Sequence, residues 1–248
     1  MTRVKVAAIL TALLTVVLWV PGPAQQSHRE LSVVKALPAG PDADPGEHVL
    51  LLLDRRLSPK LQAEIWNNGD WSYVLPPNSS EYKAFSSAPP ADARLELRRE
   101  DGTVVEERDL SHPLARIEPW NSKAPGSVFL VTVDLSAGAG SYSGPETEIV
   151  EVSGERFRDA EAADTSGKIA PIHLVKSLKS DWRILSRGTT AQILSVACHP
   201  GAHGKFVMDY ARYSLAAGKW TRRVRQTPGM WESDQAFPPT SAFPPAGS

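Results

Sequence analysis

Residues 192–231 read QILSVACHPGAHGKFVMDYARYSLAAGKWTRRVRQTPGMW, and this stretch decides the fold class. It contains three runs rich in β-branched and aromatic residues, at 193–198, 206–215 and 220–225. Each connection between the runs contains glycine, and Gly218 can supply the positive φ that a tight turn needs. The stretch therefore predicts three consecutive strands, the last two of which form a hairpin over 210–215 and 219–224.

Strand-like runs continue upstream of this stretch. Two further hairpins are predicted from a turn dipeptide that ends in glycine: Asp101-Gly102 between 94–99 and 103–108, and Ser153-Gly154 between 148–152 and 156–158. Short apolar runs of strand length also occur at 49–53, 128–133, 172–175 and 182–185, with a brief edge strand at 31–34. In the run at 182–185, Trp182 and Ile184 share one face and are expected to point inward.

Residues 57–71 form the single segment with helical spacing. Leu61 and Ile65 lie on one helical face, with Ser58 as the expected cap and Pro59 at the first helical position. We therefore predict an all-β, mainly antiparallel fold. It is a β-sandwich-like domain of short strands and hairpins, with at most one short helix in the mature chain.

Charge and cysteine content exclude several classes of protein. The chain has 248 residues, with 27 basic against 28 acidic side chains, so no overall field attracts it to nucleic acid. The basic run at 221–225 is better explained as the solvated face of a strand. Cys198 is the single cysteine, so no intramolecular disulfide can form and the core must hold the fold.

The first residues have the pattern of a signal peptide. Arg3 and Lys5 precede an uncharged stretch at 6–20, and Gly22-Pro23-Ala24 offers the small residues that signal peptidase recognises. We expect cleavage after Ala24, a secreted or periplasmic protein, and no stable membrane span after cleavage. An uncleaved anchor is the alternative.

The remaining chain divides by composition. We expect a flexible lead-in at 25–46, one β-rich domain at 47–235 and a Pro-rich tail at 236–248. In the tail, Ala-Phe-Pro-Pro occurs at 236–239 and again at 242–245. The tail either docks its two phenylalanine rings on the domain, is disordered, or serves as a polyproline ligand for a partner.

A weak metal-site candidate follows the strand at 193–198. Cys198, His199 and His203 are residue types that bind zinc, and His199 and His203 share one connection. However, a structural zinc site needs four ligands and a catalytic one needs three plus water, so His173 would have to come from elsewhere. We therefore expect neither a metal nor a cofactor.

The second candidate site is the glycine-rich segment at 138–145. It follows Asp134 at a strand end and offers Ser141, Tyr142 and Ser143, which could bind a sugar or a peptide. It could equally be a plain crossover in which glycine permits the turn. Tyr142 stands where a Gly-x-Ser-x-Gly elbow would have its nucleophile, so no recognisable catalytic motif is present.

Two further groups of side chains are candidates for binding or catalysis. Trp231 lies in a turn-rich segment and is a candidate for an exposed ring that binds a ligand. Carboxylates that could pair for glycoside hydrolysis occur at Glu146, Glu148, Asp159, Glu161 and Asp164, but the sequence does not place any two of them across a cleft.

These observations favour a noncatalytic binding or interaction module of the cell envelope or extracellular space, whose partner is an unknown protein or envelope ligand. The alternative is an exported hydrolase with its site around Asp134, the 138–145 loop, His199 and His203. The hydrolase requires two of these segments on one rim, with a base within hydrogen-bonding reach of a nucleophile.

Overall fold

The computed structural model describes residues 31–41, 43–68, 70–121, 127–134, 140–188 and 190–246. Strands account for 48% of the structure and helices for 13%, which confirms the all-β class. The expected signal peptide at 1–24 and the start of the lead-in, 25–30, lie outside the described residues.

The strands form three sheets, which we call A, B and C. Sheet A has the order β1 (Leu31–Pro38), β2 (His48–Asp54), β3 (Arg94–Arg98) and β4 (Val104–Asp109). Sheet B has the order β11 (His173–Val175), β7 (Pro145–Val152), β6 (Val128–Asp134) and β5 (Ala115–Pro119), and β8 (Phe157–Asp159) also pairs with β7. Sheet C has the order β10 (Ile169–Pro171), β9 (Glu161–Ala163), β15 (Lys219–Pro228), β14 (Phe206–Ala216), β13 (Gln192–Pro200) and β12 (Ser180–Ser186).

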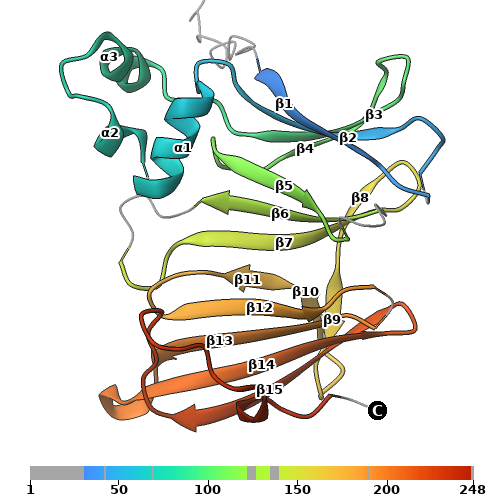
Figure 1. Ribbon diagram of the computed structural model, residues 1–248, viewed down its shortest axis with the longest axis vertical. Coiled ribbons are helices and arrows are strands. Elements are labelled where there is room, and N and C mark those ends of the chain that lie inside the picture. Colours follow the sequence, from blue (N-terminus) through green and yellow to red (C-terminus); the bar gives the residue numbers. More distant parts are fainter. Residues whose placement is uncertain are drawn as a thin grey trace, which may run out of the picture.

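Sheet B lies between the other two and contributes to two separate cores (Figure 1). Alternate residues of a strand point to opposite faces of a sheet. In β6, Phe129 and Val131 therefore pack in the core shared with sheet A, while Leu130 packs in the core shared with sheet C. The sandwich prediction is confirmed in the form of three stacked sheets, antiparallel throughout except where β15 meets β9.

The stretch at 192–231 forms β13, β14 and β15, as predicted, and the other predicted hairpins also form. In the β14–β15 turn, Ala217 and Gly218 have φ of 48° and 72°, the left-handed pair that a two-residue hairpin loop requires. Trp182 packs inward against the core between sheets B and C. Three strands were not predicted, β5, β9 and β10. β9 and β10 have only three residues each, too few to show an alternating pattern.

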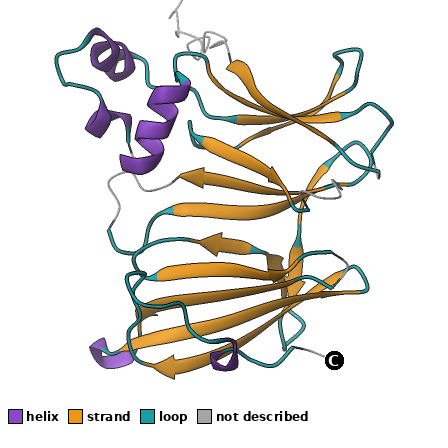
Figure 2. Cartoon of the chain, viewed as in Figure 1, coloured by secondary structure: helices purple, strands orange, loops and turns teal. Residues whose placement is uncertain are grey.

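Three short helices connect β2 to β3, where the sequence predicted one: α1 (Pro59–Asn68), α2 (Trp71–Val74) and α3 (Ser80–Ser87). Figure 2 shows them together beside sheets A and B. Ser58 caps α1 as expected, since its Oγ accepts a hydrogen bond from Leu61 N at 3.2 Å. Helix α3 was not predicted, because prolines at 76–77 and 89–90 flank it, yet Ser79 caps it and Phe85 is buried. None of the described helices is long and apolar enough to cross a membrane.

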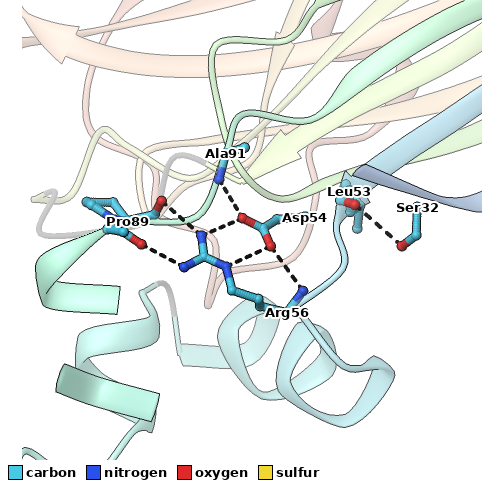
Figure 3. A network of polar contacts seen from close by, with 7 residues as sticks. Ser32, Leu53, Asp54, Arg56, Pro89 and Ala91 are labelled. Carbon is cyan, nitrogen blue, oxygen red and sulfur yellow. Dashed lines mark hydrogen bonds and ion pairs between the residues drawn. The ribbon is translucent and has the colours of Figure 1, made fainter. Parts of the chain in front are cut away.

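An ion pair at the end of β2 fixes the helices to sheet A (Figure 3). The Asp54 carboxylate is 2% exposed and accepts hydrogen bonds from Arg56 Nε at 2.9 Å, Arg56 Nη2 at 2.6 Å and Ala91 N at 2.9 Å. Arg56 also donates to the carbonyl oxygens of Ala88 and Pro89, at 2.8 and 3.2 Å. Asp54 and Arg56 therefore join the end of β2 to the segment that enters β3.

Residues 229–246, which we call the C-terminal strap, cover the outer face of sheet C. Phe243 is 3% exposed; its ring stacks on Phe237 and meets Tyr210 edge to face. Arg212 Nε donates to the carbonyl of Pro244 at 2.6 Å, and Arg183 lies over the Phe237 ring. The two phenylalanine rings thus dock on the domain, as one of the alternatives for the tail predicted.

Candidate functional site

A groove lies between the end of β4 in sheet A and the face of β6 and β7 in sheet B. Its volume is about 380 Å³. The lining combines apolar side chains, Leu110, Val131 and Val133, with polar ones, Arg108, Asp109, Ser111, Glu146 and Glu148. The groove is therefore both charged and partly apolar.

The register of β6 and β7 places the groove's carboxylates. Val131 is opposite Glu148, and Val133 is opposite Glu146. Cross-strand partners share one face of a sheet, and Val131 faces the core between sheets A and B. Both glutamates therefore project toward sheet A, beside the place where β4 ends at Asp109.

Arg108 links the two sheets at one side of the groove. Its Nη2 donates to Glu148 Oε2 at 2.8 Å, and its Nη1 donates to Asp159 Oδ1 at 2.6 Å. The guanidinium is about three-quarters buried, with a side-chain exposure of 24%. This arrangement holds Glu148 in one orientation as an acceptor.

The other two carboxylates of the groove have different partners. Glu146 Oε2 lies 2.7 Å from His173 Nε2, which is a cation only when the imidazole is protonated. Asp109 Oδ1 accepts a hydrogen bond from Arg94 Nε at 2.8 Å on the outer side of sheet A. Glu146 is thus the groove carboxylate whose paired partner is not permanently charged.

The charges of the groove favour a cationic group. The Asp109 carboxylate faces the outer side of sheet A, so the charges that face the groove are those of Glu146, Glu148 and Arg108. They leave a net charge of −1, and Arg108 already has two carboxylate partners. The partly exposed apolar side chains of Leu110 and Val133 suit the aliphatic stem of a long basic side chain. None of the described lining residues is aromatic, so the groove offers no stacking surface of the kind that binds sugar rings.

The residues predicted as a binding site around Asp134 do not form one surface. Asp134 has no exposed area, which corrects the expectation that it contacts a ligand. It lies at the end of β6 opposite Pro145, where its carboxylate is enclosed by the sheets. Of the 138–145 loop, only residues from 140 onward are described.

The described part of this loop faces solvent and rests on sheet C. Tyr142 is 47% exposed and Ser143 is exposed, whereas the carbonyl of Ser141 accepts a hydrogen bond from Lys179 N at 3.1 Å. A Cβ on Gly144 would lie 1.8 Å from the Lys176 carbonyl oxygen. The glycine is therefore needed for a close backbone approach, which supports the interpretation of a crossover.

His199 and Cys198 point away from each other, and neither forms part of a metal cluster among the described residues. His199 Nδ1 lies 3.3 Å from the Pro200 carbonyl and Nε2 lies 3.3 Å from Asp209 Oδ1. These two acceptors raise the pKa of His199, the Pro200 carbonyl more strongly than Asp209, although partial burial opposes them. Cys198 is 2% exposed. The side chain of His203 lies outside what the structure describes.

Trp231 is buried, which corrects the expectation of an exposed ring. It is 5% exposed and packs with Leu194, Val196 and Phe243 between sheet C and the later residues of the C-terminal strap. Its Nε1 donates to the Ala236 carbonyl at 3.3 Å. The turn-rich sequence around Trp231 gave no sign that the following residues fold back over it.

Sequence reasoning missed the groove. The alternation of Glu146 and Glu148 with Thr147 and Ile149 is visible in the sequence, but on its own it predicts a solvated strand face. The pairing of Glu148 with Arg108 joins residues 40 positions apart. No local pattern reports such a contact.

Comparison of the chain with protein-family models, with curated proteins and with solved structures gave no match.

Proposed function

We propose that this protein is an exported, noncatalytic binding module that takes a basic side chain of a partner protein into the groove between sheets A and B. The observation that supports it best is the pair of carboxylates, Glu146 and Glu148, that projects into the groove beside apolar side chains. A lysine or arginine can place its aliphatic stem on Leu110 and Val133 and its charge near Glu146. The partner is a protein segment of the cell envelope or extracellular space.

Export is part of the proposal. Its support is the basic start, the uncharged stretch at 6–20 and the small residues before position 25. Expression from the full-length gene in a secreting host, followed by intact-mass measurement, tests it. A mass that corresponds to a chain beginning at Gln25 is expected, and an uncleaved chain would contradict it.

The hydrolase alternative has less support. Both ring nitrogens of His199 face acceptors other than a serine hydroxyl, and Asp134 is enclosed. A glycosidase of the paired-carboxylate kind needs one carboxyl kept protonated by apolar surroundings. Glu148 instead accepts a hydrogen bond from a guanidinium.

The groove is tested with two blocked tripeptides of equal length, acetyl-Ala-Arg-Ala-amide and acetyl-Ala-Glu-Ala-amide. In ¹H–¹⁵N spectra of the exported protein at low salt, the arginine peptide should shift the amides of Val131, Val133 and Glu146, and the glutamate peptide should not. Glu146→Gln should weaken binding by about threefold or more, as expected for loss of one exposed charge pair. Glu161→Gln, an exposed carboxylate on β9, is the matched control.

Raising the salt concentration should weaken the arginine peptide's binding, because screening reduces attraction between exposed charges. Equal shifts with both peptides, or shifts that Glu146→Gln leaves unchanged, would show that the groove does not select a cation.

A further inference from the structure

A second cavity lies on the inner side of sheet C, where β9 and β10 form one edge of that sheet. Its volume is about 300 Å³. Its lining comes from the β9–β10 hairpin, from the start of β11 in sheet B, and from facing positions of β14 and β15. It shares no lining residue with the groove between sheets A and B.

Arg222 occupies an unusual position in this lining. It belongs to the basic run at 221–225, but the register of β14 and β15 places it opposite Tyr213. Cross-strand partners share one face of a sheet, and Tyr213 packs in the core between sheets B and C. Arg222 therefore lies on the inner face of sheet C, where a charged side chain is rare unless it has a partner.

Arg222 lacks such a partner among the described residues. Its Nε is enclosed and donates no hydrogen bond, and the contact that its guanidinium does make is with the Tyr213 ring, whose centre lies 5.9 Å from Cζ. By contrast, Arg56, Arg108 and Arg212, which are also partly or fully buried, each donate to two or more acceptors. A buried donor without an acceptor is costly, and such a group in a native protein calls for an explanation such as a bound ion.

The charges of the cavity favour an anion. Lys168 is a second cation in the lining, and Asp164 is its single acid. Asp164 Oδ1 is engaged in its own turn, since it accepts hydrogen bonds from Ser166 N at 2.8 Å, Ser166 Oγ at 2.6 Å and Lys168 N at 3.0 Å. His173 also lines the cavity, but its Nε2 pairs with Glu146 of the groove. Two permanent cations and one acid leave a net charge of +1.

The chemistry of the lining identifies the class of anion. A single negative charge balances the cavity, which favours a carboxylate over a phosphate dianion. The planar fork of a guanidinium also matches the two oxygens of a carboxylate. Ala170 and Pro171 are exposed apolar residues of the lining, and they suit the carbon body of an organic molecule better than an inorganic ion.

We propose that this cavity binds the carboxylate of a small organic acid. Arg222 donates to the carboxylate oxygens, Lys168 adds a second positive charge, and Ala170 and Pro171 contact the carbon body. A ligand of about ten heavy atoms held this way binds with a Kd of about 10⁻³ M. The site goes beyond the proposed function, because none of the groove residues takes part in it.

The test compares benzoate with benzamide, which has nearly the same shape but no charge. In ¹H–¹⁵N spectra of the exported protein at low salt, benzoate up to about 20 mM should shift the amides of Ala170, Tyr213 and Arg222 in a saturable way. Benzamide should shift them by less than a quarter as much. Inorganic phosphate at the same concentration should give less than half of the benzoate shifts.

Two variants remove the cations of the cavity. Arg222→Gln should weaken benzoate binding by about tenfold or more, because it removes the charged hydrogen-bond donor. Lys168→Gln lies on an exposed turn and should fold normally, yet it should weaken binding by about threefold through loss of one exposed charge.

Arg223→Gln is the matched control. Arg223 is the next residue of β15 and lies opposite Arg212 on the outer face of sheet C, so this variant should bind benzoate as the parent protein does. Equal binding by the parent protein, Arg222→Gln and Lys168→Gln would overturn the proposal, as would the absence of saturable shifts with benzoate. Shifts of equal size with benzamide, or with phosphate, would overturn the assignment to a carboxylate.

Discussion

Lys179 and Glu232 form an ion pair in which the lysine side chain is only 8% exposed. Lys179 precedes β12, its amide donates to the Ser141 carbonyl, and its own carbonyl accepts from Cys198 N at 2.7 Å. Lys179 Nζ donates a hydrogen bond to Glu232 Oε1, and this bond raises the pKa of Lys179. The pair therefore fixes the start of the C-terminal strap to the end of sheet C that also contacts the 140–144 loop.

Glu232→Gln should lower the stability of the protein more than Lys179→Met does. Glu232→Gln leaves an enclosed ammonium without a counter-charge, whereas Lys179→Met removes the charge that needed a partner. We expect the fall in urea midpoint to be about twice as large for Glu232→Gln as for Lys179→Met. Urea unfolding monitored by tryptophan fluorescence measures both midpoints. If the two midpoints fall equally, the Lys179 ammonium remains hydrated.

Phe243 should be the main anchor of the C-terminal strap. It is 3% exposed and contacts Tyr210 and Phe237, so Phe243→Ala should lower the free energy of unfolding by about 3 kcal/mol. Phe237 is only partly buried, and Phe237→Ala should cost about half as much. Urea unfolding of both variants measures the difference. A strap that contributes nothing to stability would leave the two variants within about 0.5 kcal/mol of the parent protein.

Most of the described strands, though not β5, β9 and β10, could be predicted because they are encoded locally. The apolar run at 193–198 and the turn glycines at 102, 154 and 218 depend only on neighbours along the chain. Helix α3 could not be predicted in this way, because its eight residues bury only Phe85 and its start depends on the Ser79 cap. Its burial is decided by Trp71, whose ring meets Phe85 edge to face.

The groove was harder to predict for a different reason. It is built across two sheets, as the pairing of Arg108 with Glu148 shows. Each partner alone has the sequence appearance of a solvated strand or turn. The exposure of Trp231 was predicted wrongly for a related reason. Its turn-rich segment suggested an exposed ring, but residues that follow it in the chain bury it.

Asp54 should make the protein's stability depend on pH in the acid range. Burial alone would raise the pKa of this carboxyl, but the hydrogen bonds from Arg56 and Ala91 outweigh it and lower the pKa from 3.8 to about 2. A lowered pKa in the folded state stabilises the protein above the unfolded value, and this contribution disappears as the pH falls through the folded value. The loss should therefore occur between about pH 4 and pH 2 and amount to about 2 kcal/mol.

The contribution of Asp54 is isolated by comparison with Asp54→Asn, since other carboxyls also titrate in this range. The free energy of unfolding of the parent protein should exceed that of the variant at pH 5. This difference should shrink by about 2 kcal/mol between pH 4 and pH 2. Urea unfolding at pH 5, 3 and 2 measures both. A constant difference at all three values would mean that Asp54 is not held ionised by Arg56.

His199 should bind its proton more tightly than a free histidine. One ring nitrogen faces the Pro200 carbonyl and the other faces Asp209, so both are placed to donate, which only the protonated ring can do. These contacts raise the pKa of His199 above 6.5. The stabilisation is complete below pH 6.5 and is lost as the pH rises through the higher folded value, the opposite direction to that of Asp54.

Titration followed by NMR of the His199 ring should give a pKa above 6.5 in the parent protein and a lower value in Asp209→Asn. The variant should keep part of the elevation, because the Pro200 carbonyl remains and has the larger effect. If the pKa of His199 is the same in Asp209→Asn as in the parent protein, Asp209 is too hydrated to act on the ring.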